Sequence, residues 1–266
     1  MGRAEGALRA LIPLALWLLA APAAARGEAL VVDPAVDIPL TLAPAPVWFA
    51  ISALKVDAKD LDDFPLPPRP TRLDALSPFD DEHRGAWLLS NGLLIGALGG
   101  GLAVDVWDGA RDGDASGRAL LYLEALSWVS VSTELVKAAV ERPRPYTYAT
   151  GVEEVEDLKS FFSGHTSFTA AAAFTTARSL DLTADLSPGA RWALYGGAGA
   201  LTAATGAARV VAGKHYVSDV VTGAIVGACV GWLVPELHRG DRAVGLAPWG
   251  GFGDGRAGGL MASGAF

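Results

Sequence analysis

The sequence contains a single cysteine, Cys229, among 266 residues, which excludes an intrachain disulfide. It also lacks an internal repeat, a glycine-rich nucleotide loop and any spacing typical of metal ligands. Charged residues make up only 19%, whereas apolar residues make up 51% and glycine is abundant, with 32. The chain is therefore predicted to form one domain with a large apolar core. Because Cys229 lies in an apolar run, we expect it to be buried as a small hydrophobic side chain.

The first 25 residues are typical of a secretory signal peptide. Arg3 and Arg9 flank the start, residues 11–21 are apolar, and residues 23–25 are alanines that suit a cleavage site. An uncleaved amphipathic anchor is the alternative interpretation of the same features.

Residues 26–85 are expected to form an N-terminal segment on the exported side of a membrane. Within it, residues 39–54 are apolar but interrupted by prolines, which we interpret as a peripheral or half-buried helix. Residues 55–84 are rich in Asp and Pro and predict an exposed connection. The acidic cluster at residues 60–63 could bind a cation, although a hydrated loop is the simpler interpretation of this composition.

Five apolar blocks follow and define a helical core over residues 86–238. The first block, residues 86–104, carries no charge and has about the length of a helix that spans a bilayer. The other blocks are rich in alanine and glycine, which suits close helix packing. We expect an all-α fold, an antiparallel helical bundle embedded in the membrane, with a soluble all-α protein as the alternative. The remaining blocks cover residues 119–136, 166–177, 192–208 and 217–237.

The remaining regions carry weaker signals. The glycine-rich tail, residues 239–266, is expected to be loosely ordered, and an outer-membrane strand is the less favoured alternative. His83 and His238 lie near predicted helix ends beside charged residues, so we expect both at the surface.

Three short stretches each combine basic or imidazole side chains with residues suited to binding an anion. They are residues 137–145 (KAAVERPRP), residues 163–165 (SGH) and residues 209–219 (RVVAGKHYVSD). Two of the four histidines in the chain fall inside these stretches. A phosphoryl group in transit carries charge on three oxygens, so its site needs several fixed cations, a nucleophile and a proton source.

The residue types in these stretches meet that requirement. Arg144 and Arg209 can each match two phosphate oxygens, and Lys137 can act as a compact point charge. A neutral imidazole can attack phosphorus, and a protonated one can deliver a proton to the leaving group. Asp219 follows His215 by four residues, which on a helix places both on one face, where the carboxylate could fix the imidazole tautomer.

The order of the three stretches resembles that of the phosphatidic acid phosphatase type 2 superfamily. This superfamily includes lipid phosphate phosphatases, bacterial acid phosphatases and vanadium-dependent haloperoxidases. The resemblance rests on Lys137-x6-Arg144-Pro145, Ser163-Gly164-His165 and Arg209-x5-His215-x3-Asp219.

The resemblance implies a role for each motif residue. His215 would be the nucleophile that becomes phosphorylated, Asp219 its partner and His165 the general acid. The phosphate oxygens would be bound by Lys137, Arg144, Ser163, Gly164 and Arg209.

Connectivity supports this assignment independently. If the five blocks form consecutive antiparallel helices, one end of the bundle collects four helix termini. These are the ends of the second and fourth helices and the starts of the third and fifth. All three motifs then meet there. Ser163 and Gly164, at the start of the third helix, would present backbone N–H groups to an anion.

The sequence therefore predicts a phosphatase that hydrolyses phosphomonoesters or pyrophosphates, of lipids above all, through a phosphohistidine. Its expected partners are a phosphorylated lipid or small phosphate ester and the bilayer, without nucleic acid, cofactor or metal. A soluble periplasmic acid phosphatase and a vanadium-dependent haloperoxidase are the alternatives. With a cleaved signal and a peripheral helix over residues 39–54, counting helices places the active site on the periplasmic face of a bacterial inner membrane.

Overall fold

The computed structural model describes residues 29–53, 64–70, 72–80, 82–240, 245–249 and 259–263. The predicted signal peptide and the acidic cluster at residues 60–63 lie outside these ranges. The five predicted helices are confirmed. They are α4 (Arg84–Asp112), α5 (Ala115–Val140), α7 (Gly164–Thr183), α8 (Pro188–Val211) and α9 (Val217–Leu237).

Several helices extend beyond the apolar blocks because polar residues cap their ends. Asp114 caps α5 by accepting a hydrogen bond from the Gly117 amide at 3.0 Å. Ser187 caps α8 in the same way through the Ala190 amide at 3.3 Å, with Pro188 in the first turn. Gly113 ends α4 with φ 78°, a left-handed conformation that favours glycine.

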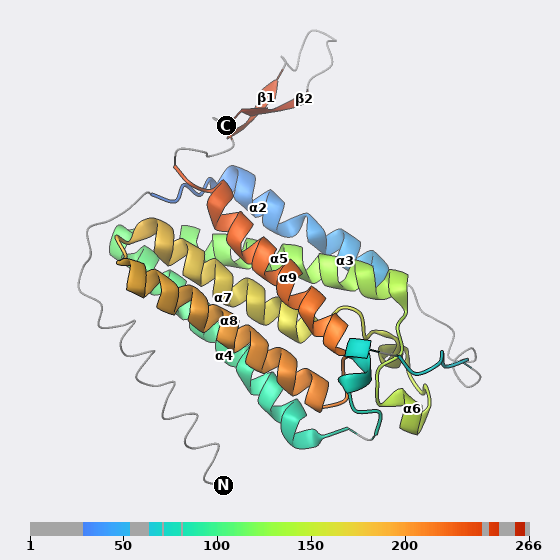
Figure 1. The fold of residues 1–266 in the computed structure, drawn as a ribbon. Coiled ribbons are helices and arrows are strands. Elements are labelled where there is room, and N and C mark those ends of the chain that lie inside the picture. Colours follow the sequence, from blue (N-terminus) through green and yellow to red (C-terminus); the bar gives the residue numbers. More distant parts are fainter. Residues whose placement is uncertain are drawn as a thin grey trace.

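Helix α7 lies at the centre of the bundle and contacts α4, α5, α8 and α9 (Figure 1). Glycines spaced by four residues let α9 approach it closely. If Gly223 carried a Cβ atom, that atom would lie 2.6 Å from the Ser163 carbonyl oxygen. A Cβ atom on Gly231 would lie 2.5 Å from the Ala171 carbonyl oxygen, and one on Gly227 would lie still closer to a carbonyl oxygen of α7. This contact fixes the start of α9 against the start of α7, where two of the motifs lie.

The outer surface of the bundle is apolar. Leu88, Leu89 and Ile95 of α4 are exposed, as are Ile225 and Trp232 of α9. Most buried positions of α7 are Ala, Ser and Thr. Large apolar side chains outside and small ones between helices are typical of helices surrounded by lipid.

Four segments are long and apolar enough to cross a bilayer, among the described residues. This confirms the predicted helical bundle and supports a membrane protein. The segments are Pro34–Ile51, Arg84–Asp112, Ala115–Val140 and Val217–Leu237.

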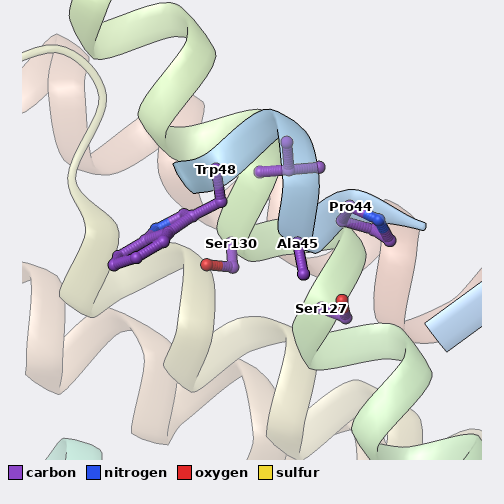
Figure 2. A pocket seen from close by; sticks show the side chains of 6 residues that line it. Pro44, Ala45, Trp48, Ser127 and Ser130 are labelled. Atoms are coloured by element: carbon purple, nitrogen blue, oxygen red, sulfur yellow. The ribbon is translucent and has the colours of Figure 1, made fainter. Parts of the chain in front are cut away.

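The N-terminal segment forms α2 (Pro34–Leu42) and α3 (Pro44–Ala53), which lie along α5 (Figure 1). Ser127 of α5 donates a hydrogen bond to the Thr41 carbonyl at 2.6 Å. The segment is the shortest of the four, with 18 residues and a mean hydropathy of 1.3, but it is still long and apolar enough to cross a bilayer, so these properties do not single it out as peripheral. Figure 2 shows a small pocket between α3 and α5, which is lined by Pro44, Ala45, Trp48, Ser127, Ser130 and Val131.

Two expectations about single side chains are wrong. Cys229 is exposed, because it lies two residues after Gly227 and so on the side of α9 that faces away from α7. His238 is buried, with 8% of its surface exposed, because it follows the end of α9 and packs between α2 and α5, as described below.

The tail is more ordered than expected over ten of its residues. Strands β1 (Gly245–Trp249) and β2 (Gly259–Ser263) pair in an antiparallel hairpin, with Ala247 opposite Met261. The connection before α4 also differs from the expected exposed loop. It contains the short helix η2 (Arg72–Leu76), whose Asp74 reaches the candidate site.

Candidate active site

The three motifs meet at one end of the bundle. Helices α5 and α8 end there, and α4, α7 and α9 begin there (Figure 1). The short helices α6 (Thr147–Thr150) and η3 (Val155–Leu158) belong to the connection between α5 and α7, which also carries Arg144 and Ser160.

His215 lies in the connection between α8 and α9, and only 2% of its surface is exposed. Its Nδ1 is 2.7 Å from the Ser160 carbonyl oxygen. Because a carbonyl can only accept, this contact places the proton on Nδ1 and leaves Nε2 with a free lone pair. Burial, followed by the nearby positive charges, lowers the pKa of His215 well below its ordinary value. The imidazole is therefore neutral at pH 7, as a nucleophile must be.

Asp219 lies close to His215, as predicted, but the two side chains are not hydrogen-bonded to each other. Its Oδ2 is 3.6 Å from His215 Nδ1, beyond ordinary hydrogen-bond length, and the Ser160 carbonyl takes that contact. The carboxylate instead accepts from Ser160 Oγ at 2.5 Å and from Arg142 Nη1 at 2.5 Å. It also accepts from the Tyr216 amide at 2.9 Å, so it caps α9 and fixes the connection that holds His215.

Three predicted cations surround the imidazoles. Arg144 is anchored by carbonyls, because its Nε donates to Glu156 O at 2.8 Å and its Nη1 to Lys214 O at 3.3 Å. Arg209 is 3% exposed, and its Nη1 lies 3.5 Å from Ser90 Oγ. Among the described residues its Nε has no hydrogen-bond partner.

The third cation, Lys137, lies beside the start of α7. Its Nζ is 2.9 Å from Glu134 Oε1. If Gly164 carried a Cβ atom, that atom would lie 3.4 Å from Nζ. With the two arginines it makes a buried region with an excess of positive charge, which an anion with several oxygens can neutralise.

His165 lies in the first turn of α7, and its Nε2 is 2.7 Å from Asn91 Oδ1 of α4. Burial is the main cause that lowers the pKa of His165 to about 3, and Arg209, Lys137 and Arg144 lower it further. Without an anion the imidazole is neutral at pH 7. A bound phosphate would offset the three cations and favour protonation of His165.

Ser163 and Gly164 differ in what they offer an anion. Ser163 Oγ caps α7 by accepting from Thr166 Oγ1 at 3.0 Å and the Thr166 amide at 3.4 Å. The Ser163 amide donates to Asp219 O at 3.1 Å, so the prediction that it faces the anion is wrong. The amides of Gly164 and His165 lie in the first turn and have no hydrogen bond within the described part of the chain, so these donors remain for an anion.

Four polar residues at the site were missed by the sequence analysis. Asn91 orients His165, and Ser160 orients both His215 and Asp219. Arg142 links Asp219 at 2.5 Å to Asp74 at 2.8 Å, and Asp74 also accepts from the Ser218 amide at 2.8 Å. Arg142 could have been found as a further basic residue of the first motif, but the other three lie outside the motifs.

Comparison with known proteins agrees with this geometry. Residues 118–242 match the model of the PAP2 superfamily, and all three motifs lie inside that range. No curated protein matches the chain. Among solved structures, the chain is similar to the first transmembrane PAP2 type phosphatidylglycerolphosphate phosphatase from Bacillus subtilis. The TM-score is 0.47 at 19% identity, covering 76% of this chain and 94% of that chain. Residues 118–242 of this protein, which contain the three motifs, are thus similar to the PAP2 superfamily.

Proposed function

We propose that the protein is a membrane phosphatase that hydrolyses phosphomonoesters or pyrophosphates of lipids through a phosphohistidine. The family match supports a phosphoric ester hydrolase. The observation that carries the proposal is the buried, neutral His215 with its free Nε2, surrounded by Lys137, Arg144 and Arg209.

In the first step, His215 Nε2 attacks phosphorus. The N–P bond forms while the P–O bond to the leaving group breaks, and His165 gives its proton to the departing oxygen. Lys137, Arg144 and Arg209 stabilise the charge on the three oxygens that stay with phosphorus. The Ser160 carbonyl accepts from Nδ1 throughout and stabilises the positive charge that develops on the ring.

In the second step, water attacks the phosphohistidine. His165, now neutral, takes a proton from the water, the new P–O bond forms and the N–P bond to Nε2 breaks. Phosphate leaves and both imidazoles return to their first state. The negative charge of the substrate phosphate favours the protonated form of His165, so the general acid carries its proton when substrate is bound.

The apolar exterior of the helices favours a lipid substrate over a soluble one. The site lies at the end of helices that are long enough to cross a bilayer, where a lipid headgroup can reach it while its chains stay in hydrocarbon.

A vanadium-dependent haloperoxidase is the second candidate, because vanadate matches phosphate in charge and could bind the same cations. The test is phosphate release by the purified protein across lipid and soluble phosphates, with and without vanadate, beside bromide oxidation with peroxide. We expect hydrolysis of lipid phosphates that vanadate inhibits competitively. Fast bromide oxidation with negligible phosphate release would contradict the proposal.

We also propose that the site faces the exported side of the membrane. The start of α2 lies near the end of α9, opposite the active site (Figure 1). If α2 and α3 together cross the bilayer, the exported orientation requires residue 29 on the inner side, which is incompatible with a cleaved signal. Because α2 and α3 lie along α5 and the segment before α2 pairs with the segment after α9, this arrangement supports the uncleaved anchor over the cleaved signal if the active site is on the exported side.

Single cysteines can test this orientation in intact cells after Cys229→Ala removes the native thiol. Glu153 is exposed at the active-site end, and Asp185 is exposed in the connection at the opposite end. We expect a membrane-impermeant maleimide to label Glu153→Cys and not Asp185→Cys until the membrane is permeabilised. The reverse pattern would place the active site on the inner face.

A further inference from the structure

A second cluster of ionisable side chains lies at the other end of the bundle. His238 follows the last residue of α9, Asp37 belongs to α2 and Glu124 to α5. Their exposed fractions are 8%, 4% and 5%. Helix α9 has 21 residues and is therefore about 30 Å long, so the cluster is remote from His215 and takes no part in the proposed reaction.

The three side chains point one donor atom each at a common centre. His238 Nε2 is 3.2 Å from Asp37 Oδ1 and 3.6 Å from Glu124 Oε2. The three atoms lie within 4.8 Å of one another. Around a tetrahedral zinc ion with bonds of about 2.0–2.1 Å, neighbouring ligand atoms are about 3.4 Å apart. The two distances from His238 Nε2 lie on either side of that value.

In His238 and Asp37, the second polar atom of the side chain is already held by the backbone. His238 Nδ1 is 2.7 Å from the Val234 carbonyl oxygen, and Asp37 Oδ2 accepts from the Asp33 amide at 2.6 Å. Such contacts orient metal-binding imidazoles and carboxylates and leave their other atoms free to bind. Here they leave Nε2 and Oδ1, the two atoms that face the centre.

Without a cation, the carboxylates of the cluster lack a full balancing charge, and one of their oxygens lacks a hydrogen-bond partner within the described part of the chain. Glu124 Oε2 is buried and has no hydrogen-bond partner among the described residues. In the part of the chain that the structure describes, His238 is the one basic side chain within 4 Å of either carboxylate. When both carboxylates are ionised beside one imidazole, the cluster carries a net negative charge, which is costly in an apolar setting. A divalent cation would neutralise both carboxylates.

Packing around the cluster is apolar and joins the segment before α2 to the end of α9. Leu121, Ala125 and Val234 form a buried group with Leu30 and Val32 against it. The Val31 amide donates to His238 O at 2.8 Å. A cation here would therefore tie α2 and the end of α9 to α5.

We propose that Asp37, Glu124 and His238 bind a divalent transition-metal ion, zinc by ligand type, as a structural site. One nitrogen and two carboxylate oxygens suit zinc, with water as the fourth ligand. The sequence shows no metal-ligand spacing because the three ligands lie far apart in the chain, in α2, in α5 and just after α9.

The test uses the full-length protein purified in detergent, stripped with a chelator, loaded with Zn²⁺ and dialysed before the metal is measured. We expect about one equivalent in the native chain and at least a tenfold loss in Glu124→Gln and His238→Gln. Glu153→Gln and His83→Gln, which change exposed side chains, are the matched controls and should bind as the native chain does. Because every variant keeps His165 and His215, metal bound at the active site would not follow this pattern.

Two further measurements separate binding from misfolding. Co²⁺ in place of Zn²⁺ should give the visible absorption of a four-coordinate site in the native chain only. Glu124→Gln removes a buried charge, so without metal it should unfold at the native temperature or above. At Zn²⁺ about 100-fold above its Kd, the native midpoint should rise by about 5 °C and that of the variant should not. Equal zinc retention in the native chain and both cluster variants, or none in the native chain, would overturn the site whatever the phosphatase assay shows.

Discussion

Replacing His215 with alanine should abolish phosphatase turnover, with a loss of about 10⁴-fold or more in kcat. The reason is chemical, since the proposed phosphohistidine forms only on the free Nε2 of this ring. His215 is buried and its pKa is lowered by burial and then by Arg144, Arg209 and Lys137, so removing it leaves the cations without their nucleophile.

The measurement is phosphate release from a lipid phosphate under single-turnover and steady-state conditions. His83→Ala is the control, because that imidazole is half exposed beside Asp80 and outside the site. The His215 variant should lose some stability, because the buried Ser160 carbonyl loses its partner, but it should still unfold cooperatively, which separates loss of chemistry from loss of fold. Native turnover in His215→Ala would exclude the proposed mechanism.

Replacing His165 with alanine should have an effect that depends on the leaving group. General acid catalysis is worth about 10²–10⁴-fold, and it is needed only where the departing oxygen is basic. We therefore expect a loss of about 10³-fold on an alkyl or lipid phosphate and a loss below about 10-fold in the phosphorylation step with an activated aryl phosphate.

The two substrates should be compared in single-turnover bursts, because His165 also activates water in the second step. Asn91→Ala provides a matched perturbation, since it removes the 2.7 Å contact to His165 Nε2 and leaves the imidazole present. Its losses should follow the same leaving-group order and be smaller. Equal losses of His165→Ala on both substrates would assign His165 a role in binding alone.

The sequence predicted the helices and the position of the motifs because both depend on local information. An apolar block of fixed length predicts a span, and consecutive antiparallel helices bring alternate ends together. The order of the motifs then places His165, His215 and Arg209 at one end without any knowledge of side-chain contacts.

Contacts between distant segments could not be predicted in this way. The Ser160 carbonyl holds His215 and the Asn91 amide holds His165, yet neither residue lies in a motif. Cys229 and His238 were assigned from their neighbours in sequence, whereas their burial depends on which face of α9 meets α7 and on how α2 packs against α5. The same limit hid the cluster of Asp37, Glu124 and His238.

Trapping the covalent intermediate tests the central claim most directly. His165→Ala treated with an activated aryl phosphate should accumulate the phosphoenzyme, because phosphorylation needs little acid help and hydrolysis lacks its base. After an alkaline denaturing quench, mass spectrometry of the peptide that contains residues 209–219 should show phosphate on His215, stable in alkali and lost in acid. The double variant His165→Ala, His215→Ala should carry none. Phosphate on another residue, or turnover of the aryl ester with no phosphoenzyme at any time point, would contradict the phosphohistidine mechanism.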